Sequence, residues 1–412
     1  LTNTVGSDVV SANGVAFNTT DNTSTSGHLK ASDNAYVGIQ SVSALAGADK
    51  DNYTFADIKG DYTVNKKAIT LTGISAADKT YDGMTTATVS TDAVVWGGRL
   101  AGDNLTVTST GAFIDKNADT AKTVSLTNTL GGDDRGNYTV TNQASTQANI
   151  TPKSLTLTAV SESKVYDGTT ASSGTVIVST MVSGDEVVTS QSFVSKDVMG
   201  PGGSTLQVNP AYTVQDGNGG KNYAVTTITA TGTVTKAPLT VKANDDARFV
   251  GLADSANFAG VQYDGWVGGD TSSVLGGTLL VKRSNVGTSA AGVYPGVLRP
   301  EGLTSNNYEI AYSSGQFTIV PADQLLIRTA PQEITYGTAP TYVTTAQYLK
   351  SDNTTIITLT GTAIGNDYTF NDALGTTVRT VLKPHAEDTL ASTSSSGHTV
   401  VGNYDIKDLN PT

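Results

Sequence analysis

An Asn-Tyr pair recurs along this chain at a nearly constant interval, and this regularity restricts the possible folds more than any other feature. The five pairs are Asn52-Tyr53, Asn137-Tyr138, Asn222-Tyr223, Asn307-Tyr308 and Asn403-Tyr404. Their tyrosines lie 85, 85, 85 and 96 residues apart. A period of this kind indicates that one structural unit is repeated along the chain.

Three further landmarks keep step with the Asn-Tyr pairs. Two alternating apolar residues, which would share one face of a strand, occur at Ile69/Leu71, Leu155/Leu157, Leu239/Val241 and Leu325/Ile327. An aromatic turn follows at Lys79–Gly83, Lys164–Gly168, Arg248–Gly251 and Ile334–Gly337. A Gly-Asp pair comes next, at Gly102-Asp103, Gly184-Asp185 and Gly269-Asp270.

Between these landmarks, short segments rich in Val, Thr, Tyr and Ile alternate with turn residues, a pattern that predicts many short strands. Only six of the 37 acidic residues are Glu and the chain contains 43 Gly, so we expect almost no helix. A repeat of this length has room for about seven strands, as in an immunoglobulin-like sandwich. The predicted fold is all-β, with tandem immunoglobulin-like β-sandwich domains arranged as an elongated rod.

The borders between repeats are expected near residues 66, 153, 236 and 321, where Pro or Lys separates consecutive strands. The predicted domains are residues 1–66, 67–153, 154–236, 237–321 and 322–412. Because the joints are short and contain no Gly/Ser linker, they should be stiff. With roughly 35 to 40 Å per repeat, we expect a monomeric rod of roughly 150 to 200 Å.

By this pattern the first and last repeats are incomplete. No aromatic turn precedes Tyr53 at the interval that separates the two landmarks in the later repeats, and the sequence stops shortly after Tyr404. We expect Leu1 and Thr412 to be fragment ends. The alternative is that neighbouring chains donate the missing strands.

Charge and composition argue against several functions. The net charge is −12 and 15% of the residues are charged, so the clustered Lys and Arg that nucleic acid requires are not expected. No apolar run approaches the roughly 18 residues that membrane insertion needs. The chain has no cysteine, which fits either the cytosol or a surface protein exported unfolded.

The turns Lys79–Gly83 and Lys164–Gly168, each followed by an Asn-Tyr strand at the same interval, resemble the YDG repeat domain of bacterial surface proteins. The segments Gly265–Thr278 and Gly292–Pro295 resemble the related MBG class of bacterial immunoglobulin-like domains. The resemblance implies YDG-type domains at 1–66 (partial), 67–153 and 154–236, and MBG-type domains at 237–321 and 322–412 (divergent and C-terminally truncated).

Domains of this kind are typical of large filamentous-haemagglutinin-like adhesins exported by two-partner secretion. The resemblance therefore implies a non-enzymatic stalk segment at the bacterial cell surface, outside the outer membrane, that projects an adhesive region for cell–cell, biofilm-matrix or host attachment. A module that itself binds carbohydrate or protein is the alternative. The implied partner is extracellular polysaccharide or a host surface protein.

Two sets of tyrosines have both a functional and a structural interpretation. Tyr81 and Tyr166, each followed by Asp, could stack on a sugar, whereas the structural interpretation buries both rings above an Asp-Gly turn. The tyrosines of the Asn-Tyr pairs resemble the tyrosine corner of immunoglobulin folds, whose hydroxyl bonds to nearby backbone. We expect both sets to be structural.

Other patterns bear on metal binding and modification. The loops Asp133–Asn137 and Asp216–Asn222 contain oxygen ligands for Ca²⁺ but no bidentate Glu. The three histidines, His28, His385 and His398, match no zinc or Ser-His-Asp pattern. Asn-x-Thr sequons occur at Asn18, Asn52, Asn104, Asn137, Asn149 and Asn353. Lys beside Asn or Asp could also form isopeptide bonds. The sequence predicts no enzyme, no cofactor, and no catalytic, cofactor-binding or metal-binding residue.

Overall fold

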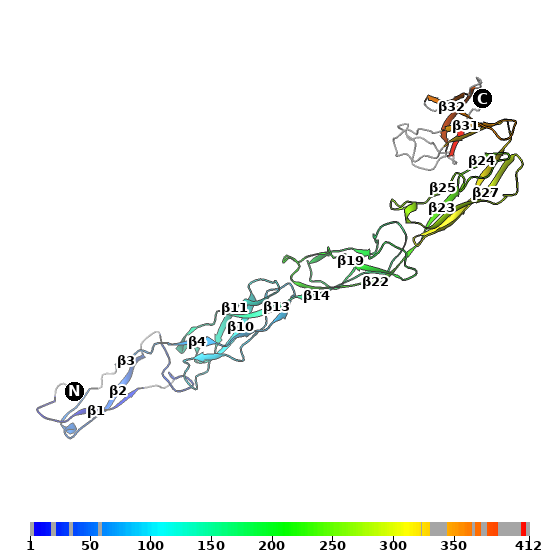
Figure 1. Cartoon of the computed structure of the whole chain (residues 1–412). Helices are drawn as coiled ribbons and strands as arrows, with labels where there is room; N and C mark the ends of the chain where they lie inside the picture. Colours follow the sequence, from blue (N-terminus) through cyan, green and yellow to red (C-terminus); the bar gives the residue numbers. More distant parts are fainter. Residues whose placement is uncertain are drawn as a thin grey trace. The chain divides into compact units, whose positions relative to one another are not determined.

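The computed structural model is built from β-strands (Figure 1). It describes residues 4–17, 22–32, 36–56, 60–322, 324–329, 344–364, 367–371, 377–385 and 405–408. Within them the helical segments are three single 3-10 turns, η1 (Lys50–Asn52), η2 (Arg135–Asn137) and η3 (Ser272–Val274). The all-β prediction is confirmed. None of the described helical segments has the length and hydrophobicity needed to traverse a lipid bilayer.

The chain divides into two compact units. The first consists of Leu1–Ala159, Thr175–Ser190 and Val208–Ile228. The second consists of Val160–Gly174, Gln191–Gln207 and Thr229–Thr412. Repeat 154–236 therefore contributes strands to both units.

The first compact unit begins with an antiparallel sheet of β1 (Ser11–Phe17), β2 (Tyr36–Ala46) and β3 (Gly60–Tyr62). Repeat 67–153 has one sheet in the order β12 (Tyr138–Thr141), β4 (Lys67–Thr72), β9 (Val95–Gly97). Its other sheet has the order β6 (Lys79–Thr80), β13 (Ser145–Thr151), β11 (Asp119–Gly131), β10 (Thr106–Phe113), β7 (Thr86–Ala87). A small ladder joins β5 (Ser75–Ala76) and β8 (Val89–Ser90).

Repeat 154–236 adds two further sheets to this unit. One has the order β16 (Ile177–Val178), β14 (Lys153–Thr158), β21 (Tyr223–Ile228). The other pairs β17 (Glu186–Val188) with β20 (Thr213–Gln215).

The second compact unit contains the remaining sheets. Its first sheet has the order β15 (Ser163–Val165), β22 (Ala230–Thr235), β19 (Ser204–Val208), β18 (Gln191–Phe193). Repeat 237–321 forms two sheets. The first has the order β25 (Val261–Asp264), β23 (Ala237–Ala243), β28 (Tyr308–Ser313). The second has the order β24 (Asp246–Phe249), β29 (Gly315–Val320), β27 (Gly292–Thr304), β26 (Gly276–Arg283). A six-stranded antiparallel sheet follows, with β30 (Leu325–Thr329), β31 (Thr344–Leu349), β32 (Ile356–Ile364), β33 (Asp367–Asn371), β34 (Thr377–His385) and β35 (Asp405–Asp408) in sequence order.

Two parallel pairings recur in each of the three repeats between residues 67 and 320. The first strand (β4, β14, β23) pairs in parallel with the Asn-Tyr strand (β12, β21, β28). The strand before the aromatic turn (β6, β15, β24) pairs in parallel with the closing strand (β13, β22, β29). Parallel partners begin and end together, so the Asn-Tyr pair lies where the chain enters a repeat and the aromatic turn lies where it leaves.

The alternating apolar pairs form the cores, as their spacing predicted. Ile69 and Leu71 are 3% and 1% exposed, and the pairs Leu155/Leu157 and Leu239/Val241 are equally well buried. The fourth pair, Leu325 and Ile327, is only partly buried and packs against a separate cluster that includes Phe370.

Consecutive repeats are joined by very short connections. Only Pro152 separates β13 from β14, and only Lys236 separates β22 from β23. The predicted direct passage from closing strand to first strand is therefore confirmed at these two joints. The aromatic turn Ile334–Gly337 and the pair Asn403-Tyr404 lie outside the described residues.

The burial of Leu155 leads to a stability prediction. Leu155→Ala should lower the free energy of unfolding by about 2 to 5 kcal/mol, because it leaves a cavity in a closed core. Hydrogen exchange of the strand Lys153–Thr158 during urea unfolding of the whole chain would measure the effect. The matched control, Ser154→Ala on the exposed face, should change it little; equal effects of both variants would contradict the core assignment.

Candidate functional site at the joints between repeats

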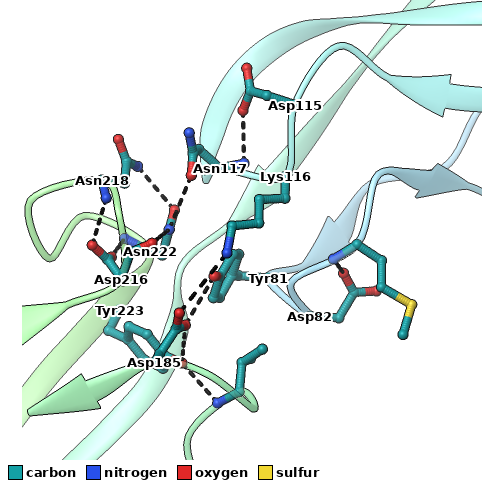
Figure 2. Close-up of polar contacts among 12 residues, drawn as sticks. Tyr81, Asp82, Asp115, Lys116, Asn117, Asp185, Asp216, Asn218, Asn222 and Tyr223 are labelled. Carbon is teal, nitrogen blue, oxygen red and sulfur yellow. Dashed lines mark hydrogen bonds and ion pairs between the residues drawn. The ribbon is translucent and has the colours of Figure 1, made fainter.

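A buried carboxylate lies at the joint between repeats 67–153 and 154–236. The side chain of Asp185 is 4% exposed. Tyr81 and Tyr223 both donate hydrogen bonds to its Oδ2, over 2.9 and 2.8 Å (Figure 2). Tyr81 comes from the aromatic turn of one repeat, whereas Asp185 and Tyr223 come from the next. Three landmarks that are far apart in sequence thus meet in one contact within the first compact unit.

The rings and charges around Asp185 complete this contact. The rings of Tyr81 and Tyr223 meet edge to face, with centroids 5.6 Å apart and an angle of 75°, a favoured geometry for aromatic pairs. Lys116 places Nζ 4.0 Å from Asp185 Oδ1 and 5.9 Å from the centroid of the Tyr81 ring. The carboxylate therefore has two hydroxyl donors and a nearby cation, contributed by both repeats.

The same arrangement returns at the next joint, within the second compact unit. Tyr166 and Tyr308 donate to Oδ2 of Asp270 over 2.9 and 2.8 Å. Their rings are again edge to face, at 5.5 Å and 77°. We call each set, Tyr81–Asp185–Tyr223 and Tyr166–Asp270–Tyr308, a Tyr–Asp–Tyr lock.

As the tyrosine-corner prediction requires, these hydroxyls bond to backbone, but each partner lies 41 positions upstream and is not near the tyrosine in sequence. The Tyr223 hydroxyl accepts a hydrogen bond from the Val182 N–H at 2.8 Å, and the Tyr308 hydroxyl accepts one from the Val267 N–H at 3.2 Å. The prediction missed the carboxylate, which is the second partner of each hydroxyl.

The asparagine of each Asn-Tyr pair also belongs to a joint. Asn222 is fully buried, and its Oδ1 accepts a hydrogen bond from the Ala118 N–H of the preceding repeat at 2.8 Å. The equivalent bonds, both 2.9 Å, run from Ala31 to Asn137 and from Val198 to Asn307. In the pairs Asn222-Tyr223 and Asn307-Tyr308, both side chains therefore contact the preceding repeat.

The aromatic turn is shaped by its Lys, Asp and Gly. Asp82 Oδ1 accepts the Met84 N–H at 2.9 Å and the Lys79 ammonium at 2.8 Å. Gly83 has φ +79°, and a Cβ there would lie 2.7 Å from a methyl group of Val182 in the next repeat. A side chain at this position would therefore strain the backbone and also push the repeats apart.

Tyr81 and Tyr166 are 1% and 2% exposed, so the structural interpretation of these tyrosines is confirmed. A ring enclosed in this way presents no face on which a sugar could stack. The polar end of each ring is likewise taken by the carboxylate of the next repeat.

The joint that precedes repeat 67–153 uses different donors. Asp103 is 5% exposed and accepts hydrogen bonds from Tyr138, Ser24 and Ser26. The serines come from residues 22–32 and bond to Oδ1, whereas Tyr138 bonds to Oδ2. The carboxylate and the second tyrosine are thus retained, while two hydroxyl groups of serine occur where the other joints use an aromatic turn.

The suggested Ca²⁺ loops have their central carboxylates engaged by the protein itself. Burial raises the pKa of Asp216, but hydrogen bonds from the backbone N–H groups of Gly220, Asn218 and Asn222 outweigh it and lower the pKa overall. Asp134 accepts N–H bonds from Asn104 and Thr25. Within the described part of the chain, no three His, Cys, Asp or Glu residues form a group suited to a metal ion.

The remaining candidates do not converge on one place. His28 lies 2.7 Å from Ser26 Oγ at the first joint, His385 lies in β34, and His398 is outside the described residues. Among the sequons, Asn137 and Asn149 use their amide oxygens for backbone hydrogen bonds, and Asn18 is outside the described residues.

An ion pair has the residue types of an isopeptide bond. Lys122 Nζ lies 2.6 Å from Asp115 Oδ1, and the Lys122 side chain is 7% exposed. The Lys122 hydrogen bond, together with the Asn117 N–H, lowers the pKa of Asp115, so its carboxyl group is ionised. In the structure the two side chains form a salt bridge.

Sequence reasoning missed the loop that covers each lock. Lys116-Asn117 and Lys196-Asp197 occupy matching places in successive repeats, and each pair begins three positions after a buried phenylalanine, Phe113 or Phe193. Asn117 and Asp197 both accept a hydrogen bond from the joint asparagine of the next repeat. The repeated pattern Phe-x-x-Lys-(Asn/Asp) was the signal that could have identified this loop.

Removing the shared carboxylate should loosen a joint. Asp185→Ala leaves the Tyr81 hydroxyl without its acceptor and should cost about 3 kcal/mol, since a hydrogen bond to a charged group is worth roughly 1.5 to 3 kcal/mol. Hydrogen exchange of residues 79–84 and 182–186 in the whole chain would report the loss. Glu186→Ala removes an equal charge from the exposed neighbouring position, and a similar loss in this control would argue against the lock.

The locks should also make the chain sensitive to alkaline pH. Burial, reinforced by the neighbouring Asp, raises the pKa of Tyr81, Tyr166, Tyr223 and Tyr308 to about 12. The unfolded tyrosine titrates near pH 10, so between about pH 10 and 12 the unfolded state loses protons first and the free energy of unfolding falls. Urea unfolding across this range would show the decline. The double variant Tyr81→Phe, Tyr166→Phe should decline less steeply, and an identical slope would contradict the assignment.

Comparison with known families agrees with the repeat pattern. Residues 65–148 and 151–230 match the YDG domain, and residues 239–318 match the MBG domain of the YGX type. No curated protein and no solved structure matches the chain significantly. Both Tyr–Asp–Tyr locks involve matched segments, one between the two YDG segments and the other between the second YDG segment and the MBG segment. The chain thus contains two YDG domains followed in tandem by an MBG domain.

Proposed function

We propose that this chain is a non-enzymatic stalk segment of a large bacterial surface adhesin. The observation that carries the proposal is the repetition of the Tyr–Asp–Tyr lock at two successive joints. Bending at such a joint would separate a carboxylate from its hydroxyl donors, which is costly where the carboxylate is shielded from water. Stiff joints between similar domains extend the reach of a chain and do not by themselves create a pocket.

The location that suits this role is the bacterial cell surface, outside the outer membrane. The tandem YDG and MBG domains support a repeat module of the adhesin type. The lack of cysteine is compatible with export of an unfolded chain by two-partner secretion. In this setting the segment would hold an adhesive region away from the cell for cell–cell, biofilm-matrix or host attachment.

The partner of the adhesin is proposed to be extracellular polysaccharide or a host surface protein, bound outside this segment. The four tyrosines of the locks are buried and are unavailable for stacking on a ligand. A glycan array separates the two roles: a spacer gives no specific signal with the whole chain, whereas a carbohydrate-binding module gives a saturable one.

Small-angle scattering of the whole chain tests the spacer role. Stiff joints predict a monomer with a maximum dimension of roughly 150 to 200 Å. A compact fold of 412 residues would instead have a radius of gyration of about 22 Å, and that value would contradict the proposal.

The contribution of the locks can be measured in the same experiment. The double variant Asp185→Ala, Asp270→Ala should shorten the mean dimension and broaden its distribution, because both joints become hinges. Exposed Glu186→Ala is the control for loss of a surface charge beside the first lock and should scatter like the original chain. An unchanged profile for the double variant would show that the locks do not determine joint stiffness.

A further inference from the structure

The first joint contains a cavity beside Asp103, the carboxylate that corresponds to Asp185 and Asp270 at the other two joints. Its volume is about 80 Å³, and its lining includes Leu100, Asp103, Asn137 and Tyr138 of repeat 67–153. Ser24 and His28, from residues 22–32, also line it.

The lining residues Leu100, Asp103, Asn137 and Tyr138 are the counterparts of the residues around Tyr81. Leu100 and Val182 each donate a backbone N–H to the tyrosine hydroxyl of the Asn-Tyr pair, at 3.1 and 2.8 Å. That tyrosine donates to an Asp in both joints, Asp103 in one and Asp185 in the other. The preceding asparagine accepts a backbone N–H from the previous segment in both, over 2.9 and 2.8 Å. The same frame therefore surrounds a ring in one joint and an open space in the other.

We propose that this cavity is a vacant tyrosine slot, which binds the para-hydroxyphenyl side chain of a Tyr-Asp-Gly turn from a partner segment. The incoming hydroxyl would donate to Asp103, as Tyr81 does to Asp185 and Tyr166 to Asp270. The ring would meet Tyr138 edge to face. The two Tyr-Asp-Gly turns of this chain are buried at their own joints and are not free to enter.

The serine turn at the first joint acts as a replaceable cover over the slot. Ser24 and Ser26 occupy Asp103 Oδ1, and the exposed His28 reaches back to Ser26 at 2.7 Å. An apolar cavity of about 150 Å³ accommodates benzene, so the space beside Asp103 must widen to admit a ring. We place the hinge for this outward movement of the turn at Gly27, where an added Cβ would meet no atom within 4 Å.

Amide hydrogen exchange of the whole chain, with p-cresol as probe, tests the slot. At ten times the dissociation constant, exchange of residues 22–32 and 98–104 should slow about tenfold. Toluene, which has no hydroxyl group to donate to Asp103, should bind at least about tenfold more weakly. The variant His28→Ala, which opens the cover, should bind p-cresol more tightly. Absence of protection, or equal binding of toluene and p-cresol, would overturn the proposal.

The Tyr81→Ala variant provides a matched positive control, because it empties the equivalent slot beside Asp185 and Tyr223. Here p-cresol should restore slow exchange to residues 182–186. Rescue at this joint without any protection of the first joint would mean that the serine turn keeps the first slot closed, and the proposal would fail. Failure at both joints would show that the frame does not recognise a phenol, with the same consequence.

A peptide distinguishes a docked turn from a free phenol. The six-residue peptide of Lys79–Met84 should protect the first joint, whereas the same peptide with phenylalanine in place of tyrosine should not. Protection by p-cresol without protection by the peptide would overturn the assignment of a Tyr-Asp-Gly turn as the occupant. Because none of these measurements depends on the dimensions of the chain, their outcome is independent of the stalk proposal.

Discussion

A carboxylate removed from water needs donors, and at two joints of this chain the donors come from two different repeats. Asp185 and Asp270 each accept one tyrosine hydroxyl from their own repeat and one from the repeat before. Neither repeat alone supplies both hydroxyl donors, and a carboxylate shielded from water is destabilised when it loses a donor. The stability of a repeat is therefore coupled to its docking against its neighbour, as expected of an array with nearest-neighbour interactions.

The sheet topology explains why these groups can meet. Two parallel pairings bring the aromatic turn to the exit of a repeat and the Asn-Tyr pair to its entrance. A single residue, Pro152, then joins exit to entrance at the first of the two locks. Short connections leave little freedom for the two ends to separate. Each lock follows from this arrangement of strands together with its two tyrosines and its aspartate, and no additional linker is required.

The first joint shows which parts of this design are exchangeable. The entrance of repeat 67–153 retains the Asp, the Tyr and the Asn, which bond in the same manner as at the other joints. The exit side is replaced by a serine turn that supplies hydroxyl donors of smaller volume. The serine hydroxyls thus preserve hydrogen-bond donors for Asp103 but do not fill the volume of a tyrosine ring, and a cavity lies beside Asp103. The entrance is the constant half of the joint, and the exit side is the half that can vary.

Much of this organisation could be predicted from the sequence. The period of the Asn-Tyr pairs determined that the chain is repetitive, and the composition determined that it is all-β. The alternation of Leu155 and Leu157 determined which side chains form a core. These properties depend on local pattern, which a single chain displays directly. The role of Asp185 could not be derived in this way, because its partners Tyr81 and Tyr223 lie 104 and 38 residues away. Only the tertiary structure decided that a tyrosine of one repeat donates a hydrogen bond to the carboxylate of the next. Hydrogen bonding depends on proximity in space, and the parallel pairings that create this proximity connect strands that are distant in sequence.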